Sequence, residues 1–416
     1  MGSSKKMGTL AEKIISRKAK KIVQAGEIVI VPVDWAFCQD GTGPLTIDGI
    51  LEIGRGVKKP ENCIFFIDHA VPPPRKELAN AHKKIRDFAE KFSIKVFMQG
   101  VCHQLMIEKF SSPYDIIVGA DSHTPTSGAL GAFASGFGST DVASAFVTGS
   151  IWLKVPEVIA FKLKGKLNAR VSGKDLILKI IGDIGSDGAI YKSLEFFGEG
   201  VKNISMDERF TISNMSIEAG AKTGIFPADE ITEKYLKEMG RENDFEELLP
   251  DESAYKNFTE IDLSEIKPQV AFPHEVSNVY EVEKIEKTPI DVVFIGTCTN
   301  GRFFDFLKAG EILKKSERIK TRLIIGPASK DILHKLISTK LIDVFLRRGA
   351  ILIPPGCGPC CGVHEGILAD GERCLSTANR NFKGRMGNPE SFVYLASPET
   401  CAATAITGFI TDPREI

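Results

Sequence analysis

Short apolar runs, rich in β-branched and aromatic residues, recur in this chain and limit the folds available to it. Each early run is followed by a polar turn, and helical patterns such as KELANAHKKIRDFAEKF (76–92) lie between them. Apolar runs of this length separated by helical segments indicate buried parallel strands in α/β units. The early runs are EIVIVPVD (27–34), NCIFFIDH (62–69), IKVFM (94–98) and YDIIVGAD (114–121). We therefore predict a doubly wound sheet in the first region.

The alternation of short apolar runs with helical patterns returns in the last part of the chain, after an intervening segment. From residue 288 the runs DVVFIGTC, TRLIIGPAS and AILIPPG alternate with helical patterns. Before them, VPEVIAFKLKGKL (155–167) alternates only partly, which suggests an antiparallel edge strand, and a polar, helix-rich segment follows. A chain of 416 residues accommodates roughly two to four domains. We predict three α/β domains, at 1–155, 156–287 and 288–416.

Composition excludes several classes of protein. The chain has ordinary globular proportions, and its net charge of −1 provides no global field for a nucleic acid or an anionic membrane, so we expect neither as a partner. It has no apolar run of about 18 residues and no signal-peptide pattern, so we expect a cytoplasmic protein. Met7 is a candidate native start, with residues 1–6 an addition. The nine cysteines are too sparse for a secreted disulfide scaffold, so clustered ones are expected to be metal ligands or nucleophiles.

Two cysteine motifs stand in the third predicted domain. Cys357 and Cys360 are three residues apart in GCGPCCGVHEG (356–366), and Cys298 ends an apolar strand in IGTCTNGR. A helix is expected to begin just after Cys298, so its dipole should acidify this thiol. All three cysteines would sit at strand ends of one sheet and can therefore converge.

Several interpretations of this cysteine group are open. A structural zinc ion would need a fourth ligand, and His364 is the only nearby histidine. A redox dithiol would leave Cys298 without a use. Three thiolates around a cluster of four irons would leave one iron without a protein ligand, free to act as a Lewis acid. Cys361 is the obvious rival ligand, although we expect its side chain to point away because adjacent side chains diverge.

Acidic residues and histidines follow three of the early strands. Asp68 and His69 end one run, His103 stands in GVCHQ, and Asp121, Ser122 and His123 end another. Ligands bind beyond the carboxyl ends of strands in such sheets. An acidic neighbour orients an imidazole and raises its pKa, which suits it to protonate a departing hydroxyl.

A basic loop follows the cysteine loop. Arg380 and Arg385 lie in STANRNFKGRMGNP (376–389), and two guanidinium groups in one loop suit a carboxylate-rich substrate. Asn214 and Glu218 are four residues apart and share one face if their segment is helical.

Taken together and in order, these motifs resemble those of the aconitase superfamily, from about residue 10 to the C terminus. They are IDH, GVCHQ, GADSHTPTSGALGAFASGFGSTD, ISNMSIEAGAKTGIFPADE, IGTCTNGR, GCGPC and STANRNFKGR. The chain most resembles the archaeal-type large subunit shared by 3-isopropylmalate dehydratase and homoaconitase. In that family three cysteines hold a 4Fe-4S cluster, and catalysis removes and re-adds water across adjacent carbons. The resemblance implies three α/β domains around a central cluster cleft.

The resemblance also implies roles for individual residues. It implies Cys298, Cys357 and Cys360 as cluster ligands. Asp68 and His69 resemble the pair that protonates the leaving hydroxyl. The remaining implied residues are His103, Asp121, His123 and Glu218 around the open iron, Gln39, Ser122, Arg380 and Arg385 for substrate, and Asn214, Asn300 and Asn379 beside the cluster.

Two further expectations come from the resemblance. The chain stops at DPREI without the swivelling fourth domain that carries the serine base, so a separate small subunit is expected to supply it. The expected substrate is 3-isopropylmalate, in leucine biosynthesis. Homocitrate, citrate and 2,3-dimethylmalate are the alternatives, because DSHTPTSGA replaces the DSHTCTHGA of many such subunits and Gln39 replaces a histidine. A zinc-dependent hydrolase and an iron-sensing RNA-binding protein are the other classes considered.

Overall fold

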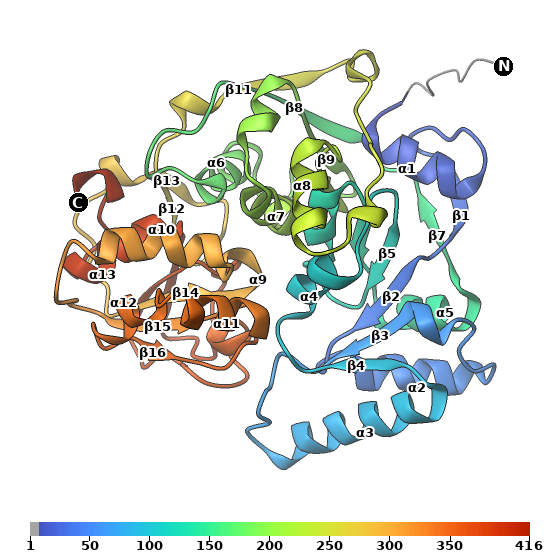
Figure 1. Cartoon of the computed structure of the whole chain (residues 1–416), viewed down its shortest axis with the longest axis horizontal. Coiled ribbons are helices and arrows are strands. Elements are labelled where there is room, and N and C mark those ends of the chain that lie inside the picture. The colour runs from blue at the N-terminus through green and yellow to red at the C-terminus, as the bar shows by residue number, and fades with distance from the viewer. Residues whose placement is uncertain (1–7) are drawn as a thin grey trace.

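The computed structural model describes residues 8–416, whose strands form sheets of five, four and seven strands and one separate strand pair (Figure 1). Met7, the candidate start, lies outside the described residues. The described chain begins with α1 (Leu10–Ala19), which Thr9 caps. Among the described helices, none is both long and apolar enough to cross a membrane. The predicted α/β class is confirmed, because most strands pair in parallel.

The first sheet consists of five parallel strands that pack on both faces. In β3 all four side chains are buried, and alternate residues enter different cores. Ile64 and Phe66 pack with residues of the seven-stranded sheet, whereas Cys63 and Phe65 pack with helices on the opposite face. This double burial explains the uninterrupted apolar run. In sheet order the strands are β4 (Lys95–Phe97), β3 (Cys63–Phe66), β2 (Trp35–Cys38), β5 (Ile116–Gly119) and β6 (Phe133–Gly136).

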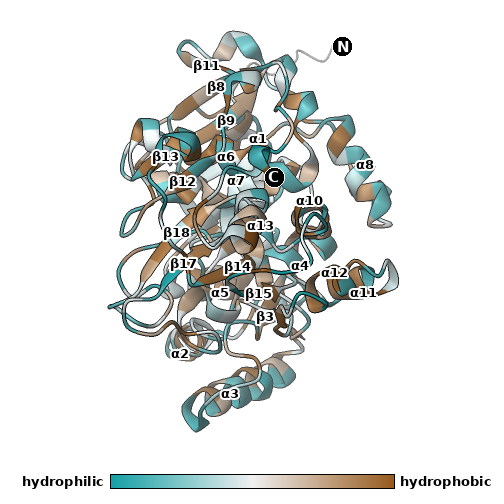
Figure 2. Ribbon diagram, turned by 90° about the vertical axis from the view of Figure 1, so that its left-hand side faces the viewer, coloured by the Kyte–Doolittle hydropathy of each residue, from teal (hydrophilic) through white to brown (hydrophobic). Residues whose placement is uncertain are grey.

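Of the helices beside this sheet, α3 buries a single stripe, whereas α4 (Cys102–Lys109) is buried from Cys102 through Ile107. Helix α3 spans Lys76–Phe92, as predicted, and buries His82, Ile85, Phe88 and Ala89 along one face. Figure 2 shows hydrophilic stretches on the outlying α3, while the hydrophobic strands of the seven-stranded sheet run through the interior. The other helices here are α2 (Gly43–Ile53), α4 (Cys102–Lys109) and α5 (Ser139–Thr148).

The prediction for residues 27–34 is wrong in one respect. The strand there, β1 (Ile28–Pro32), pairs antiparallel with β7 (Ser150–Lys154), outside the five-stranded sheet. Its residues alternate between exposed and buried: Ile28 and Ile30 are exposed, whereas Val29 and Val31 are buried. The run therefore has the period-two pattern of a half-solvated strand despite being apolar throughout.

The second sheet has four parallel strands, in the order β10 (Thr223–Ile225), β9 (Ser193–Phe197), β8 (Val158–Lys164) and β11 (Phe258–Asp262). The expected antiparallel edge at 155–167 is therefore wrong, because β8 lies between two parallel neighbours. Its partial alternation arises from Lys162 and Lys164, which reach Glu252 and Glu260 on one solvated face. The associated helices are α6 (Gly173–Ile184), α7 (Met206–Met215) and α8 (Glu230–Glu238).

The seven-stranded sheet begins before residue 288. Strand β12 (Gln269–Ala271) pairs antiparallel with both β13 (Val279–Glu281) and β18, so two strands of this sheet come from the second predicted segment. The remaining strands are parallel. They are β18 (Phe392–Ala396), β17 (Arg373–Ser376), β14 (Val292–Gly296), β15 (Arg322–Gly326) and β16 (Ile351–Leu352). The helices are α9 (Thr297–Asn300), α10 (Phe303–Leu313), α11 (Lys330–Ser338), α12 (Ile342–Leu346) and α13 (Pro398–Thr407).

Candidate active site

A cavity of about 320 Å³ lies where strand ends of the five-stranded and seven-stranded sheets meet. Most of its lining residues follow the carboxyl ends of β2, β3, β5, β14 and β17 by one to four residues, or come from the Cys357–Cys361 loop. The others are His103, at the start of α4, and Arg385, nine residues after β17. Parallel sheets place functional loops at such edges. The lining includes Gln39, His69, His103, Asp121, Ser122, His123, Cys298, Cys357, Cys360, Cys361, Asn379, Arg380 and Arg385.

The three predicted cysteine ligands are buried around this cavity, with exposures of 4 to 6%. Cys298 stands on α9, and the other two stand on a tight turn. Within that turn Gly358 has φ +54°, and a Cβ there would lie 2.3 Å from Ile353 Cδ1. A glycine is therefore required for the turn to pack against the end of β16. The amide of Cys357 donates to the carbonyl of Asp68 at 3.0 Å, which ties the turn to the first sheet.

Nitrogen donors point at two of these sulfurs. Asn214 Nδ2 lies 3.3 Å and Asn379 Nδ2 lies 3.6 Å from Cys298 Sγ. Arg385 Nη2 lies 3.5 Å from Cys360 Sγ. Such donors stabilise the thiolate form that a metal requires. The set is therefore chemically suited to hold a thiolate-bound metal centre.

The expected acidification of Cys298 is wrong. Burial raises the pKa of Cys298 to about 12, with the charge of Cys360 adding to the effect. Burial likewise raises the pKa of Cys357 well above its ordinary value. Helix α9 has only four residues, so its dipole is too small to oppose burial. Deprotonation at this site would come from a bound metal, which deprotonates a coordinating thiol.

The spacing of the sulfurs argues against a single zinc ion. Around one tetrahedral zinc, ligand sulfurs lie about 3.8 Å apart. Among residues 8–416, the three cysteines do not form a group whose sulfurs all lie within 4.8 Å of one another. The proposed fourth ligand also faces elsewhere, because His364 Nε2 lies 2.6 Å from the carbonyl oxygen of Pro72. Ligand atoms within 4.8 Å of one another do occur at this site in two other groups, Asp68 with His69 and Cys357, and His103 with Asp121 and His123.

Cys361 lines the same cavity, contrary to the expectation that it points away. Residues 358–361 form a 3₁₀ turn, in which successive side chains are about 120° apart. Cys360 and Cys361 can therefore both face one space. Cys361 remains the rival ligand.

Asp68 and His69 form a close pair at the end of β3. His69 Nδ1 lies 2.9 Å from Asp68 Oδ1, and His69 Nε2 lies 3.7 Å from Asp121 Oδ2. Burial lowers the pKa of His69, but the charge and hydrogen bond of Asp68 outweigh it, so the pKa lies well above its ordinary value. The raised pKa favours the imidazolium form of His69, which lines the cavity and can donate a proton there.

A second chain of ion pairs joins the three sheets. His103 Nε2 lies 2.8 Å from Asp121 Oδ1, and His123 Nε2 lies 2.8 Å from Glu218 Oε1. Arg380 Nε donates to both oxygens of Glu218 at 2.9 Å. Burial raises the pKa of Glu218, but the hydrogen bond and charge of His123 outweigh it, so the pKa is lowered. Glu218 therefore orients a histidine and an arginine rather than lining the cavity itself.

Two other predicted site residues, Gln39 and Asn300, differ from each other in their position relative to the cavity. Gln39 lines the cavity, and its Nε2 lies 3.3 Å from Asp121 Oδ2. Asn300 does not line it, because its side chain donates to Thr211 at 3.1 Å and to Asp305 at 2.8 Å. The structure thus brings together every predicted site residue except Asn300, with Asp68, Asn214 and Glu218 placed just behind the wall.

Sequence reasoning missed two residues that hold the site loops. Asp40 accepts from the amides of His69 at 2.9 Å and Ala70 at 3.0 Å, and from His82 Nε2 at 3.0 Å. Its position next to Gln39, at the end of β2, was the available signal. Lys174 is fully buried and donates to the carbonyl groups at 377 and 378, directly before Asn379. No sequence signal marks Lys174, which reads as one residue of an ordinary helix.

We expect Asp40→Asn to destabilise the first sheet by about 2 kcal/mol at neutral pH. Burial raises the pKa of Asp40, but the hydrogen bond from His82 and the charge of His69 outweigh it and lower the pKa to about 2. A depressed pKa contributes stability above the ordinary value of 3.8, and this is lost as pH falls towards 2. Thermal unfolding at pH 7 should therefore show a lower midpoint in the variant, and the difference should shrink in acid. Asp48→Asn, at an exposed ion pair, is the control and should change little.

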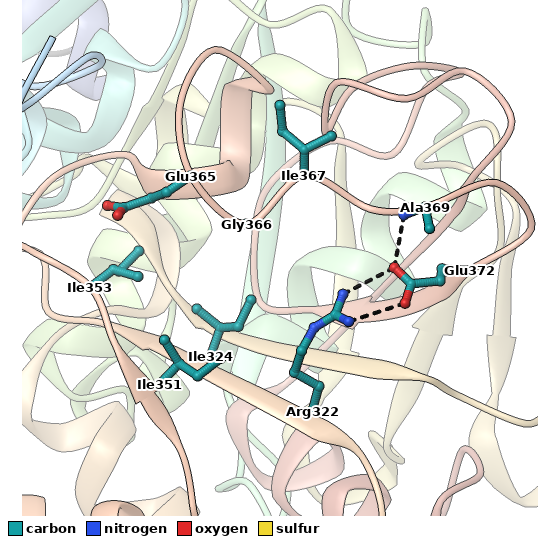
Figure 3. A pocket seen from close by; sticks show the side chains of 9 residues that line it. All are labelled: Arg322, Ile324, Ile351, Ile353, Glu365, Gly366, Ile367, Ala369 and Glu372. Atoms are coloured by element: carbon teal, nitrogen blue, oxygen red, sulfur yellow. Dashed lines mark hydrogen bonds and ion pairs between the residues drawn. The ribbon is translucent and has the colours of Figure 1, made fainter. Parts of the chain in front are cut away.

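A second hollow, of about 390 Å³, lies at the β15–β16 edge of the seven-stranded sheet (Figure 3). Isoleucine side chains from β15, β16 and the loop at 366–367 form much of its wall. Its clearest polar feature is the bidentate pair of Arg322 and Glu372, at 3.1 and 3.0 Å. Both of those groups are already occupied, and its lining includes no cysteine or histidine. This hollow therefore lacks the thiols and imidazoles that line the first cavity.

Comparison with known proteins agrees with this geometry. The family model described as "Aconitase family (aconitate hydratase)" matches residues 12–408. The chain is 52% identical to the 3-isopropylmalate dehydratase large subunit 1 of Thermotoga maritima, over 98% of this chain and 99% of that one. It is 45% identical to the methanogen homoaconitase large subunit of Methanocaldococcus jannaschii, over 97% and 99%.

A solved structure gives the same result for the fold. The holo-form of Thermococcus kodakaraensis aconitase X superposes with a TM-score of 0.50 at 12% identity, over 89% of each chain. With the family match and the full-length relatives, this shows that the chain belongs to the aconitase family of hydro-lyases.

Proposed function

We propose that this chain is the cluster-binding large subunit of a hydro-lyase that isomerises 3-isopropylmalate by dehydration and rehydration. The observation that carries the proposal is the convergence of three buried cysteines, the hydrogen-bonded Asp68–His69 pair and two arginines on one cavity. The name of the Thermotoga maritima relative, at 52% identity, supports the choice of substrate.

The residues fit a 4Fe-4S cluster held by Cys298, Cys357 and Cys360. The donors from Asn214, Asn379 and Arg385 are suited to thiolate sulfurs. A cluster with three protein ligands supplies a Lewis acid for the substrate hydroxyl.

The chain's own groups would move the proton and hold the substrate. His69 donates from Nε2 to the departing hydroxyl, while Asp68 fixes Nδ1 and keeps the ring protonated. Arg380 uses Nε for Glu218, so its terminal nitrogens are the part that can take a substrate carboxylate. Arg385 is the second carboxylate ligand and also contacts Cys360.

A small subunit is the proposed partner, because the full-length relatives are named large subunits. It would supply the base that removes the carbon-bound proton. Homoaconitase activity is the second candidate, favoured by the name of the Methanocaldococcus jannaschii relative. These two activities differ in the substrate side chain, so they are separable by assay.

The test is anaerobic reconstitution with iron and sulfide, followed by electron paramagnetic resonance and co-expression with a small subunit. We expect four irons per chain, a three-iron signal after mild oxidation, and turnover of 3-isopropylmalate only in the complex. Homocitrate, citrate and 2,3-dimethylmalate are assayed alongside. Stoichiometric zinc in place of iron would overturn the proposal.

A further inference from the structure

Arg302 is a buried cation close to the candidate active site, and the proposed function gives it no role. It is 2% exposed and stands four residues after Cys298, between the end of α9 and the start of α10. It does not line the candidate cavity. Burying a guanidinium group is costly unless its donors are paired, so the partners of Arg302 indicate what it holds in place.

The guanidinium group of Arg302 binds the carbonyl end of the Cys298 turn, which we define as residues 296–301. Nη1 donates to the carbonyl of Cys298 at 2.8 Å, and Nη2 donates to the carbonyl of Thr299. Both carbonyls belong to the four-residue α9, whose end supplies no further turn of amide donors. Nη2 also donates to Thr211 Oγ1 at 2.6 Å, so α7 fixes the guanidinium group from the other side.

The Cys298 turn has a strained backbone. Thr297 has φ +73°, in the left-handed region that a β-branched residue rarely adopts. Such a conformation persists only where the surrounding structure holds it. Before the strained residue, Thr377 Oγ1 accepts from the amide of Gly296 at 2.9 Å and donates to its carbonyl at 3.1 Å. The turn is therefore fixed at both ends, by Thr377 at its start and by Arg302 at its end.

Arg302 acts on one of the two segments that carry the proposed cluster ligands. Cys298 lines the candidate cavity from the Cys298 turn. The other two ligands stand in the Cys357–Cys361 loop, which is tied to the carbonyl of Asp68. Within residues 8–416, the hydrogen bonds and ion pairs of the Arg302 guanidinium group reach the first segment and not the second.

The charge of Arg302 is balanced separately from these hydrogen bonds. Its Nε lies 3.2 Å from Asp207 Oδ1 and 3.8 Å from Asp305 Oδ2. A lysine at this position would keep a positive charge near both carboxylates. Its single nitrogen cannot reproduce the planar fork with which arginine spans two acceptors. Substitution can therefore separate the charge of Arg302 from its geometry.

We propose that Arg302 is a positioning residue that holds the Cys298 turn, and with it one ligand of the proposed metal centre. It acts through Cys298 and does not touch the substrate. The inference rests on the proposed function only for the identity of that centre. In the cluster-free chain, Arg302 keeps the Cys298 turn closed, and in the loaded chain it slows the loss of iron.

Hydrogen–deuterium exchange of the full, cluster-free chain, followed by mass spectrometry, tests the first part. Arg302→Lys keeps the charge and removes the fork. We expect exchange in the peptide spanning 296–302 to rise about tenfold or more, because the amides of Gly296 and Thr299 lose their protection when the turn opens. The peptide spanning 356–362 should exchange as it does in the unaltered chain, whereas a general loss of stability would affect both peptides.

Arg241→Lys is the matched control. Arg241 also donates to two backbone carbonyls, those of Ile107 at 3.2 Å and Ser111 at 2.9 Å, but these belong to α4 and the loop after it. It should leave exchange in both peptides unchanged. Thr211→Val removes the hydroxyl that fixes Arg302 Nη2 and is a second variant, which should raise exchange at 296–302 by a smaller factor.

Iron loss from the reconstituted chain tests the second part. In the presence of an iron chelator, Arg302→Lys should lose iron about tenfold faster than the unaltered chain or Arg241→Lys. A chain that takes up no iron would contradict the proposed function, and the exchange experiment would still decide the role of Arg302. Unchanged exchange at 296–302 in the folded variants, an equal rise at 356–362, the same rise in Arg241→Lys, or equal rates of iron loss would each overturn the assignment.

Discussion

We expect Cys357→Ser to abolish assembly of the proposed iron–sulfur cluster and Cys361→Ser to leave the cluster in place. Cys357 is buried, and its amide is held by the carbonyl of Asp68, so its sulfur is fixed at the cavity. Serine keeps the size of the side chain but offers a hard oxygen in place of a soft thiolate. The measurements are iron and sulfide content and the visible absorbance of the reconstituted chain. We expect loss of essentially all iron in the first variant and a near-complete cluster in the second.

The control for this comparison is Cys63→Ser, which alters a buried thiol of the five-stranded sheet. It should retain the cluster if the effect is due to ligation rather than to the loss of a buried thiol. Circular dichroism of each variant tests whether the chain is folded. A full cluster in folded Cys357→Ser, with its loss in Cys361→Ser, would assign the third ligand to Cys361 instead.

We expect His69→Gln to retain the proposed cluster but to lose turnover by about 10²- to 10⁴-fold in the complex with the small subunit. Glutamine has no titratable proton, so it cannot protonate the departing hydroxyl. The measurement is kcat on 3-isopropylmalate together with iron content. His334→Gln, at an exposed position on α11, is the control and should leave both unchanged. A kcat close to that of the unaltered enzyme would exclude His69 as the acid.

The same role predicts a direction for the pH profile. The active form of His69 is protonated, and its pKa is raised well above the ordinary value, chiefly by Asp68 against the opposing effect of burial. The rate should therefore persist through neutral pH and fall as pH rises through that raised pKa. In Asp68→Asn the alkaline fall should move to lower pH, because the charge that favours the imidazolium has gone. An unmoved profile would mean that another group is the acid.

Much of the fold could be predicted because a strand buried on both faces of a parallel sheet has an uninterrupted apolar run in its own short sequence. The ranges 62–69, 114–121 and 291–298 each contain an uninterrupted apolar stretch, which forms a buried strand, and polar residues follow at the carboxyl end. The prediction that residues 27–34 join the buried parallel sheet was wrong because one face of a two-stranded ribbon is exposed to solvent. Isoleucines on that face are exposed although the composition of the segment is typical of a core strand.

Within the site, contacts between neighbours in sequence were predictable, and contacts between sheets were not. Asp68 and His69 are adjacent, so their pairing needed no tertiary information. Glu218 lies 95 residues from His123 and 162 from Arg380, and only the packing of all three sheets brings them together. The orientation of Asn300 was also not predictable from the sequence. It stands two residues from Cys298, yet its side chain donates to Asp305 instead of lining the cavity.

The order and type of the chemistry-bearing residues, and the strands that carry them, were determined by the sequence by itself. They depend on periodicity and on residues a few positions apart. Tertiary structure alone decided which thiols face the cavity, which carboxylates stay ionised, and how high the pKa of Cys298 lies. The physical reason is that pKa values and hydrogen-bond partners depend on burial and on charges brought close by chain folding, and neither quantity is a property of a short segment.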